Sequence, residues 1–164
     1  MNNDLQCFFI KKVDGKVKTI IFDSITALDN FIGYLFDYAK FSTDIRKMGD
    51  EDIVECAKDY IAAIMSYLFV CAPPDELNDG VLRTFVAETV VNGDDPVDLV
   101  FRDFENDVKN GSSYITTQLD KEFANNAIYL QQTFMMLLPE TKYCVLGECL
   151  RMLCKLESKI QKEI

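Results

Sequence analysis

The most apolar segment of the chain lies between Asp50 and Pro74, and its pattern predicts a helix that begins in solvent and ends in the protein interior. Polar residues are frequent in its first part, whereas from Tyr60 to Ala72 only Ser66 interrupts the apolar residues. A helix that is apolar on nearly all sides has to be enclosed by other elements. We therefore predict that this segment is the central helix of a small globular domain.

Apolar residues recur every three or four positions in five other segments, as expected of helices with one buried face. Capping residues, prolines and Asn-Gly pairs mark where these segments begin and end. The five predicted helices run from Ser24 to about Lys40, Val81 to Val91, Asp95 to Asn110, Tyr114 to Leu138, and Thr141 to the C-terminus. In this prediction Ser112 or Ser113 starts the fourth of these helices, Pro139 closes it, and Thr141 caps the last one.

The N-terminal segment, residues 5–22, predicts a β-hairpin because two arms rich in β-branched and aromatic residues flank the turn-forming pair Asp14-Gly15. An isolated hairpin is only marginally stable in water, so we expect this one to pack against helices. Its lysines are interpreted as charges that protect an exposed strand edge: Lys11, Lys12, Lys16 and Lys18. The overall prediction is one mainly α domain over residues 1–164, with the hairpin at 5–22 and a six-helix bundle at 24–163.

The composition adds a strong charge imbalance to this picture. The chain has 164 residues, of which 49% are hydrophobic, and 27 acidic residues against 17 basic ones give a formal net charge of -10. This charge disfavours binding to nucleic acids and anionic membrane surfaces, which are themselves negative. It favours a basic protein partner, or it serves solubility alone.

The six cysteines are expected to be reduced thiols in the cytoplasm. The N-terminal sequence lacks the basic start and long apolar stretch of a secretory signal. The apolar part of the predicted central helix is shorter than the roughly 20 residues that span a bilayer. We therefore expect a cytoplasmic protein with no membrane association.

The residues that usually carry catalysis are scarce. Histidine is absent, which removes the commonest general base and metal ligand and excludes Ser-His and Cys-His nucleophiles. Cys144, Cys149 and Cys154 are five residues apart, which separates them by about 140° around a helix and prevents a shared zinc site. No glycine-rich phosphate loop is present, and Asn110-Gly111 before Ser112 is interpreted as helix punctuation. We expect neither enzymatic activity nor a cofactor.

Carboxylates are the remaining candidates for a functional site. Asp52, Glu55 and Asp59 share one face of the predicted central helix, and Asp103 and Asp107 share a face of another. Like charges at these spacings destabilise a helix by a few tenths of a kcal/mol, which suggests that another interaction favours them. Such acids could bind Mg²⁺ for phosphate chemistry, or they could form a solvated face that meets a basic partner.

A long acidic stretch runs from Asp94 to Asp107, where Arg102 is the only basic residue. Its six acids are the predicted contacts for a basic partner: Asp94, Asp95, Asp98, Asp103, Glu105 and Asp107. In general character, as a small acidic chain without catalytic residues, the protein resembles immunity proteins of bacterial toxin and immunity pairs, such as those that guard against contact-dependent inhibition nucleases. The resemblance implies a binding protein that neutralises a basic nuclease by imitating its substrate.

Two alternatives stay open at this point. A buried central helix surrounded by amphipathic ones also resembles the viral relatives of the Bcl-2 family, which are adaptors with a hydrophobic groove. The chain departs from that family because it lacks the Asn-Trp-Gly-Arg motif and contains no tryptophan. The second alternative is an all-α, Mg²⁺-dependent phosphohydrolase that uses Asp52, Glu55 and Asp59.

Overall fold

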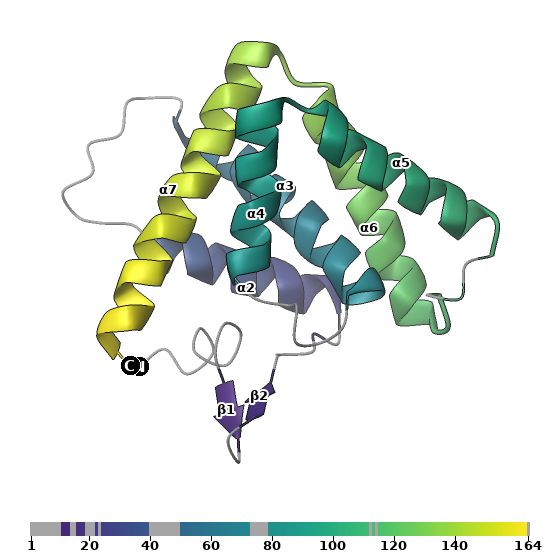
Figure 1. The fold of residues 1–164 in the computed structure, drawn as a ribbon, viewed down its shortest axis with the longest axis horizontal. Coiled ribbons are helices and arrows are strands. Elements are labelled where there is room, and N and C mark those ends of the chain that lie inside the picture. Colours follow the sequence, from purple (N-terminus) through teal and green to yellow (C-terminus); the bar gives the residue numbers. More distant parts are fainter. Residues whose placement is uncertain are drawn as a thin grey trace.

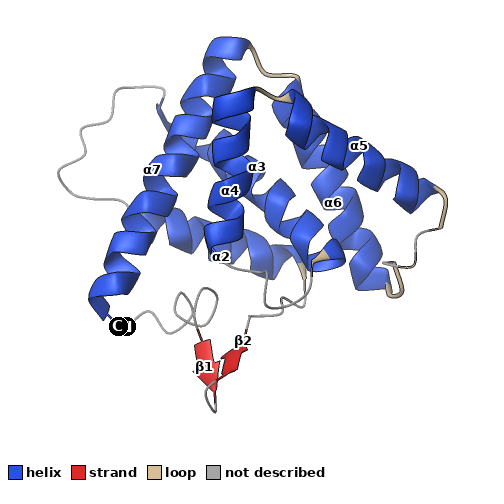
Figure 2. Ribbon diagram, in the orientation of Figure 1, coloured by secondary structure: helices blue, strands red, loops and turns tan. Residues whose placement is uncertain are grey.

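The computed structural model describes residues 11–13, 16–18, 22, 24–39, 50–72, 79–111, 113 and 115–163. Within these ranges the chain is mainly α, as predicted (Figure 2). Its six described helices are α2 (Ile25–Ala39), α3 (Asp50–Cys71), α4 (Asp79–Asn92), α5 (Asp95–Lys109), α6 (Gln118–Met135) and α7 (Pro139–Glu163).

Two short strands lie within the segment predicted as a hairpin. Strands β1 (Lys11–Val13) and β2 (Lys16–Lys18) pair in antiparallel fashion, with Lys11 opposite Lys18. The Asp14-Gly15 turn and the outer parts of both arms lie outside the described residues. The complete hairpin at 5–22 and its packing against the helices therefore remain predictions.

Helix α3 is the central element of the bundle, as its apolar pattern predicted. It contacts α2, α4, α6 and α7, and Figure 1 shows it passing behind α4 among the other helices. Residues 60–66 are all buried, whereas Asp52, Glu55 and Asp59 near its start are exposed. Ser66, the single polar residue in the apolar run, accepts a 3.0 Å hydrogen bond from Nδ2 of Asn126 on α6. The buried half of α3 is therefore enclosed by other helices, and Ser66 within it has a hydrogen-bond partner.

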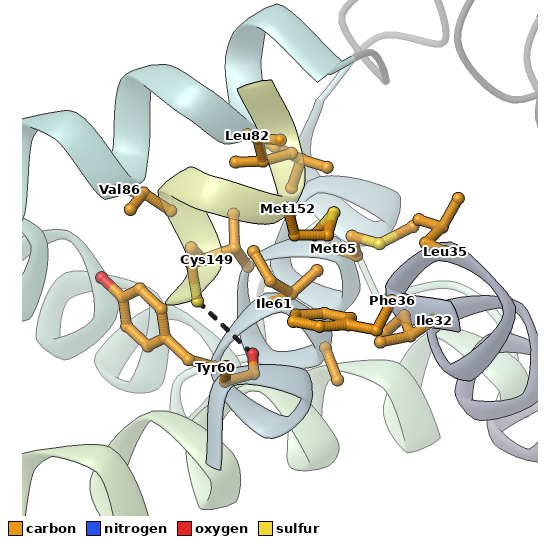
Figure 3. Packing of buried hydrophobic residues seen from close by; sticks show 14 of the residues in the cluster. Ile32, Leu35, Phe36, Tyr60, Ile61, Met65, Leu82, Val86, Cys149 and Met152 are labelled. Carbon is orange, nitrogen blue, oxygen red and sulfur yellow. Dashed lines mark hydrogen bonds between the residues drawn. The ribbon is translucent and has the colours of Figure 1, made fainter. Parts of the chain in front are cut away.

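The larger hydrophobic cluster joins α3 to the helices around it. Figure 3 shows Ile61 and Met65 of α3 packed among side chains from α2, α4 and α7. Cys149 of α7 is fully buried there, and its Sγ lies 3.6 Å from the carbonyl oxygen of Ala57. Burial raises the pKa of this thiol, so it stays protonated and acts as a small apolar side chain.

A smaller hydrophobic cluster attaches α5 and α6 to α3. Val97, Phe101 and Phe104 form the buried stripe of α5 and pack against alanines of α3 and α6. The ring of Tyr67 on α3 lies 5.3 Å from that of Phe101 and 5.1 Å from that of Phe104. These contacts fix which face of α5 points inward, and hence which face carries its acids outward.

Three predicted helix starts are wrong, and the first is that of α4, which begins at Asp79 rather than Val81. Helix α6 begins at Gln118 rather than Tyr114, because Thr117 caps it and Asp120 closes a reciprocal capping box with the Thr117 backbone. Helix α7 begins at Pro139 rather than after Thr141, because proline fits the first turn of a helix, where its missing N–H has no acceptor to reach. The predicted end of α6 is also wrong, because the helix ends at Met135 rather than at Leu138, and Pro139 starts the next helix instead of closing this one.

Glycines end two helices where Asn-Gly pairs predicted it. Gly93 follows α4 with φ of +81°, and its N–H donates to the carbonyl of Thr89 at 3.0 Å. Gly111 follows α5 with φ of +80°. Glycine adopts this left-handed geometry without the steric cost that other residues meet. None of the described helices is long and apolar enough to cross a membrane.

Candidate functional site

Helix α5 carries five of the six acids predicted to contact a partner, and Asp94 precedes its first residue. The structure separates these acids into two groups. Asp95, Asp103 and Asp107 are exposed, and within the described part of the chain none of them forms an ion pair. The other three acids are half-buried and have partners: Asp94, Asp98 and Glu105. Of the six acids predicted to contact a partner, the structure therefore leaves three exposed and holds three in contacts within the protein.

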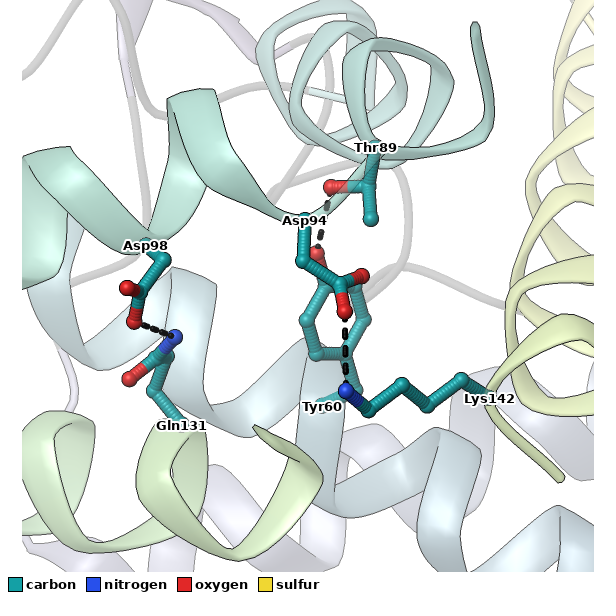
Figure 4. Close-up of polar contacts among 6 residues, drawn as sticks. All are labelled: Tyr60, Thr89, Asp94, Asp98, Gln131 and Lys142. Carbon is teal, nitrogen blue, oxygen red and sulfur yellow. Dashed lines mark hydrogen bonds and ion pairs between the residues drawn. The ribbon is translucent and has the colours of Figure 1, made fainter. Parts of the chain in front are cut away.

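Asp94 links the start of α5 to the start of α7. Its Oδ2 accepts a 2.8 Å hydrogen bond from Nζ of Lys142, in an ion pair whose side chains are only 27% and 16% exposed (Figure 4). The same ammonium group lies 5.9 Å from the centre of the Phe134 ring on α6, within the range of a cation–π contact. Lys142 therefore holds the ends of three helices together.

Asp98 and Glu105 each accept a hydrogen bond from a glutamine of helix α6. Oδ1 of Asp98 accepts a 3.3 Å hydrogen bond from Gln131, and Oε2 of Glu105 accepts a 3.4 Å hydrogen bond from Gln132. On α5 itself, Asp98 pairs with Arg102 at 2.7 Å and Glu105 pairs with Lys109 at 3.5 Å. Each carboxylate thus has one amide partner across the helix interface and one basic partner on its own helix.

Behind these acids, a buried tyrosine connects α3 to α4. The hydroxyl of Tyr60 lies 2.9 Å from Oγ1 of Thr89, and Thr89 Oγ1 donates to the carbonyl of Phe85 at 3.2 Å. Because the single proton of the threonine hydroxyl is used in that second contact, Tyr60 is the donor to Thr89. Burial raises the pKa of Tyr60, so its hydroxyl is neutral. This contact joins the interior of α3 to α4.

A groove of about 400 Å³ runs between α5 and α6 beside Asp98 and Glu105. Its apolar lining includes Phe101 of α5 and Ile128 and Met135 of α6. Sequence reasoning identified the acids but missed this groove and the glutamines that hold the acids in place. The only local signal was the adjacent polar pair Gln131-Gln132, which interrupts the apolar stripe of α6.

Exposed apolar side chains gather near one end of this groove. Seven large hydrophobic residues are exposed in the described part of the chain. Six of them lie where α4 and α6 end and where α5 and α7 begin: Val90, Val91, Leu99, Met136, Leu138 and Tyr143. Figure 1 shows these four helix ends converging at the top of the molecule. The acidic helix therefore lies next to accessible apolar surface.

The acids of α3 form a different arrangement. Glu55 pairs with Lys58 at 3.3 Å, and both Asp52 and Asp59 are exposed. Partial burial raises the pKa of Asp59, and the carboxylates of Glu55 and Asp29 raise it further. Within the described residues, no three His, Cys, Asp or Glu side chains are placed to hold a metal ion. The alternative magnesium site at Asp52, Glu55 and Asp59 therefore has no geometric support.

Burial disfavours the ionised form of two partly buried cysteines, Cys56 and Cys71. The five cysteines in the described part of the chain are all free: Cys56, Cys71, Cys144, Cys149 and Cys154. Burial raises the pKa of Cys71 to about 11, and it also raises the pKa of Cys56. A thiol must ionise to act as a nucleophile, so these two are poor candidates for covalent catalysis.

No protein-family model matches the chain, and no curated protein or solved structure shows significant similarity to it. The arrangement at α5 offers fixed carboxylates, exposed carboxylates and a largely apolar groove, which together suit the binding of another molecule.

Proposed function

We propose that this chain is a non-catalytic binding protein that occludes a basic protein partner, of which a nuclease-type toxin is the leading class. The observation that carries the proposal is the outer face of α5, where Asp95, Asp103 and Asp107 are exposed and, within the described residues, form no ion pair. Acids without partners in the free protein keep their charge available for an incoming base.

The physical basis of this binding is electrostatic steering followed by occlusion. The net charge of -10 attracts a basic surface over several ångströms, and a nuclease surface is basic because it holds phosphates. Carboxylates on α5 can then take the place of those phosphates. Asp94, Asp98 and Glu105 are already fixed by contacts within the protein, so they lose little further side-chain freedom on binding.

Charge reversal on α5 tests the proposal. We expect Asp103→Lys combined with Asp107→Lys to slow association with a basic nuclease domain by about tenfold or more, because steering governs the association rate. The control pair, Asp37→Lys with Glu122→Lys, makes the same change in net charge at exposed positions on α2 and α6. Stopped-flow association rates at about 50 and about 200 mM salt provide the measurement.

Two results would overturn this proposal. One is that no member of a panel of basic nuclease domains binds the wild-type protein. The other is that both charge-reversal pairs slow association equally, which would show that net charge alone acts and that α5 has no special role. A salt-dependent rate that falls only in the α5 variant supports the proposal.

A second candidate is the helical adaptor, and the groove between α5 and α6 is the observation that favours it. Helical adaptors bind the apolar face of an amphipathic helix in such a groove. An adaptor of this kind would bind an uncharged amphipathic helix as tightly as a basic one. That difference separates it from the first proposal.

A cytoplasmic location belongs to the same proposal. The five described cysteines are free thiols, which suits a reducing compartment. The negative charge of the chain also argues against nucleic acids and anionic membranes as direct partners.

A further inference from the structure

We infer that the groove between α5 and α6 binds one amphipathic helix of the partner, with its apolar face against Phe101, Ile128 and Met135 and two basic side chains, two turns apart, against Asp98 and Glu105. This inference rests on the proposed function, because it assumes a basic protein partner. It adds the part of that partner that is recognised and the place where it binds.

The size and lining of the groove suit a row of apolar side chains. Its volume of about 400 Å³ lies within the usual range for binding pockets, about 300 to 1,000 Å³. Phe101 and Ile128 supply rigid apolar walls, while Met135 and Met136 supply flexible ones that adapt to the shape of an occupant. Met136 is 86% exposed at the edge of the groove, so an occupant that covers it removes a large apolar area from water.

The acidic side chains along the groove are held in place, whereas their basic partners are largely exposed. The carboxylates of Asp98 and Glu105 are held by glutamine amides from α6, and the side chain of Asp98 is only 13% exposed. Their present basic partners, Arg102 and Lys109, are 73% and 69% exposed. Because both of these basic side chains are largely exposed, an arriving base can take the place of either one.

The spacing of the two acids favours a helix as the occupant. Asp98 and Glu105 are seven residues apart on α5, which corresponds to about 10.5 Å along the helix axis. A helix lying alongside presents side chains from one face at that same interval. In a strand, about 10 Å covers three residues, and side chains three apart point to opposite faces. A strand therefore could not place bases on both acids from one side.

A second copy of this chain is a poorer occupant. Each copy carries a net charge of -10, so two copies repel one another. Sedimentation of the protein alone measures whether two copies associate. If they associate through the groove, changes at Met136 would weaken that association.

A synthetic helix is the direct probe. The peptide has about 18 residues, or five turns, with leucines along one face and two arginines seven positions apart. One matched peptide replaces both arginines with glutamine, and another replaces them with glutamate. Fluorescence anisotropy of each labelled peptide is measured against the whole protein. We expect the arginine peptide to bind at least about tenfold more tightly than the glutamine peptide, and the glutamate peptide to bind weakest.

Variants of the protein locate the binding site. Met136→Lys places a positive charge at the groove and removes apolar surface, and we expect it to weaken the arginine peptide by about tenfold. The matched control is Tyr129→Lys on α6, the helix that Met136 caps at its C-terminal end, at a residue that is 67% exposed and does not line the groove. We expect this control to change affinity by less than about twofold. Because both residues are exposed, both variants should fold, and thermal unfolding verifies that they do.

The outcomes separate this inference from the proposed function. Equal binding of the arginine and glutamine peptides, or equal weakening by Met136→Lys and Tyr129→Lys, would overturn the inference. A basic nuclease domain that depends on Asp103 and Asp107 but is indifferent to Met136→Lys would overturn it while leaving the proposed function intact. Failure of every basic domain to bind, with the arginine peptide still bound in the groove, would instead overturn the proposed function.

Discussion

The two acidic regions of this protein, the start of α3 and the length of α5, look alike in sequence but differ in what surrounds them. On α3, Asp59 lies near Glu55 and Asp29, and partial burial together with these carboxylates raises its pKa. On α5, Asp98 and Glu105 face glutamine amides from α6 and basic residues of their own helix. In the first region carboxylates repel one another, whereas in the second hydrogen bonds and ion pairs hold the acids in place.

This difference shows that spacing along a helix does not define the role of an acid. Carboxylates at spacings of four and seven residues occur in both regions, yet on α5 Asp98 and Glu105 lie beside a groove and receive donors from a neighbouring helix. An acid that receives such donors contributes to stability and keeps a fixed position. The four predictions below test this contrast by mutation and pH.

The largest expected effect comes from removing the base that holds Asp94. We expect Lys142→Met to lower the free energy of unfolding by about 2 kcal/mol, between the values for exposed and fully buried ion pairs, because the pair is mostly buried. Urea unfolding measures the change. Lys121→Met on α6, an exposed lysine, is the control and should change stability by less than about 0.5 kcal/mol. Equal effects of the two changes would show that the Asp94 contact contributes nothing.

The next largest effect is expected at Asp98, which accepts a hydrogen bond from the buried Gln131. We expect Asp98→Ala to destabilise the protein by about 1.5 kcal/mol, because Gln131 is only 4% exposed and would lose its acceptor. Asp103→Ala, at an exposed acid of the same helix, should stay within about 0.5 kcal/mol of wild type. The comparison fails if urea unfolding gives the same value for both variants.

Asp120 provides an acid whose contacts are entirely local. Burial tends to raise its pKa, but hydrogen bonds from Thr116 and Thr117 outweigh this and lower it. Its folded pKa is thus below its unfolded pKa, so its contribution is present at neutral pH and is lost as pH falls through the folded pKa. We expect Asp120→Ala to cost about 1 kcal/mol at pH 7.

The free energy of unfolding of Asp120→Ala should approach that of the wild-type protein as pH falls below about 4. Glu122→Ala, at an exposed residue two positions further on, is the matched control and should show no such convergence. A pH-independent loss of stability in Asp120→Ala would contradict the role of its ionised carboxylate.

The smallest effect has the opposite sign. We expect Asp59→Asn to stabilise the protein by a few tenths of a kcal/mol at pH 7, because it removes repulsion with Glu55 and Asp29. Since the folded pKa of Asp59 is raised, the ionised acid costs stability at neutral pH, and this cost disappears at acid pH when the carboxylate is protonated. Thermal unfolding at about pH 7 and about pH 3 measures the difference. Destabilisation at pH 7 would mean that Asp59 has a favourable contact and would break the contrast with α5.

Much of the fold follows from local patterns in the sequence. The apolar run from Tyr60 to Ala72 predicted a buried central helix, and the Asn-Gly pairs predicted the ends of α4 and α5. These predictions were confirmed because apolar periodicity and left-handed glycine geometry act over only a few residues. The starts of α6 and α7 were predicted wrongly even though their signals are also local. The capping box of Thr117 and Asp120 starts α6, and a proline in the first turn starts α7.

The candidate site divides in the same way. The stretch from Asp94 to Asp107 is strongly acidic in any fold, since charge depends only on residue type. Which of these acids are held and which face solvent depends on the packing of the helices. Gln131 contacts Asp98 from 33 residues away, and Lys142 contacts Asp94 from 48 residues away. Such contacts depend on how the helices pack, and the groove beside them exists only between two packed helices.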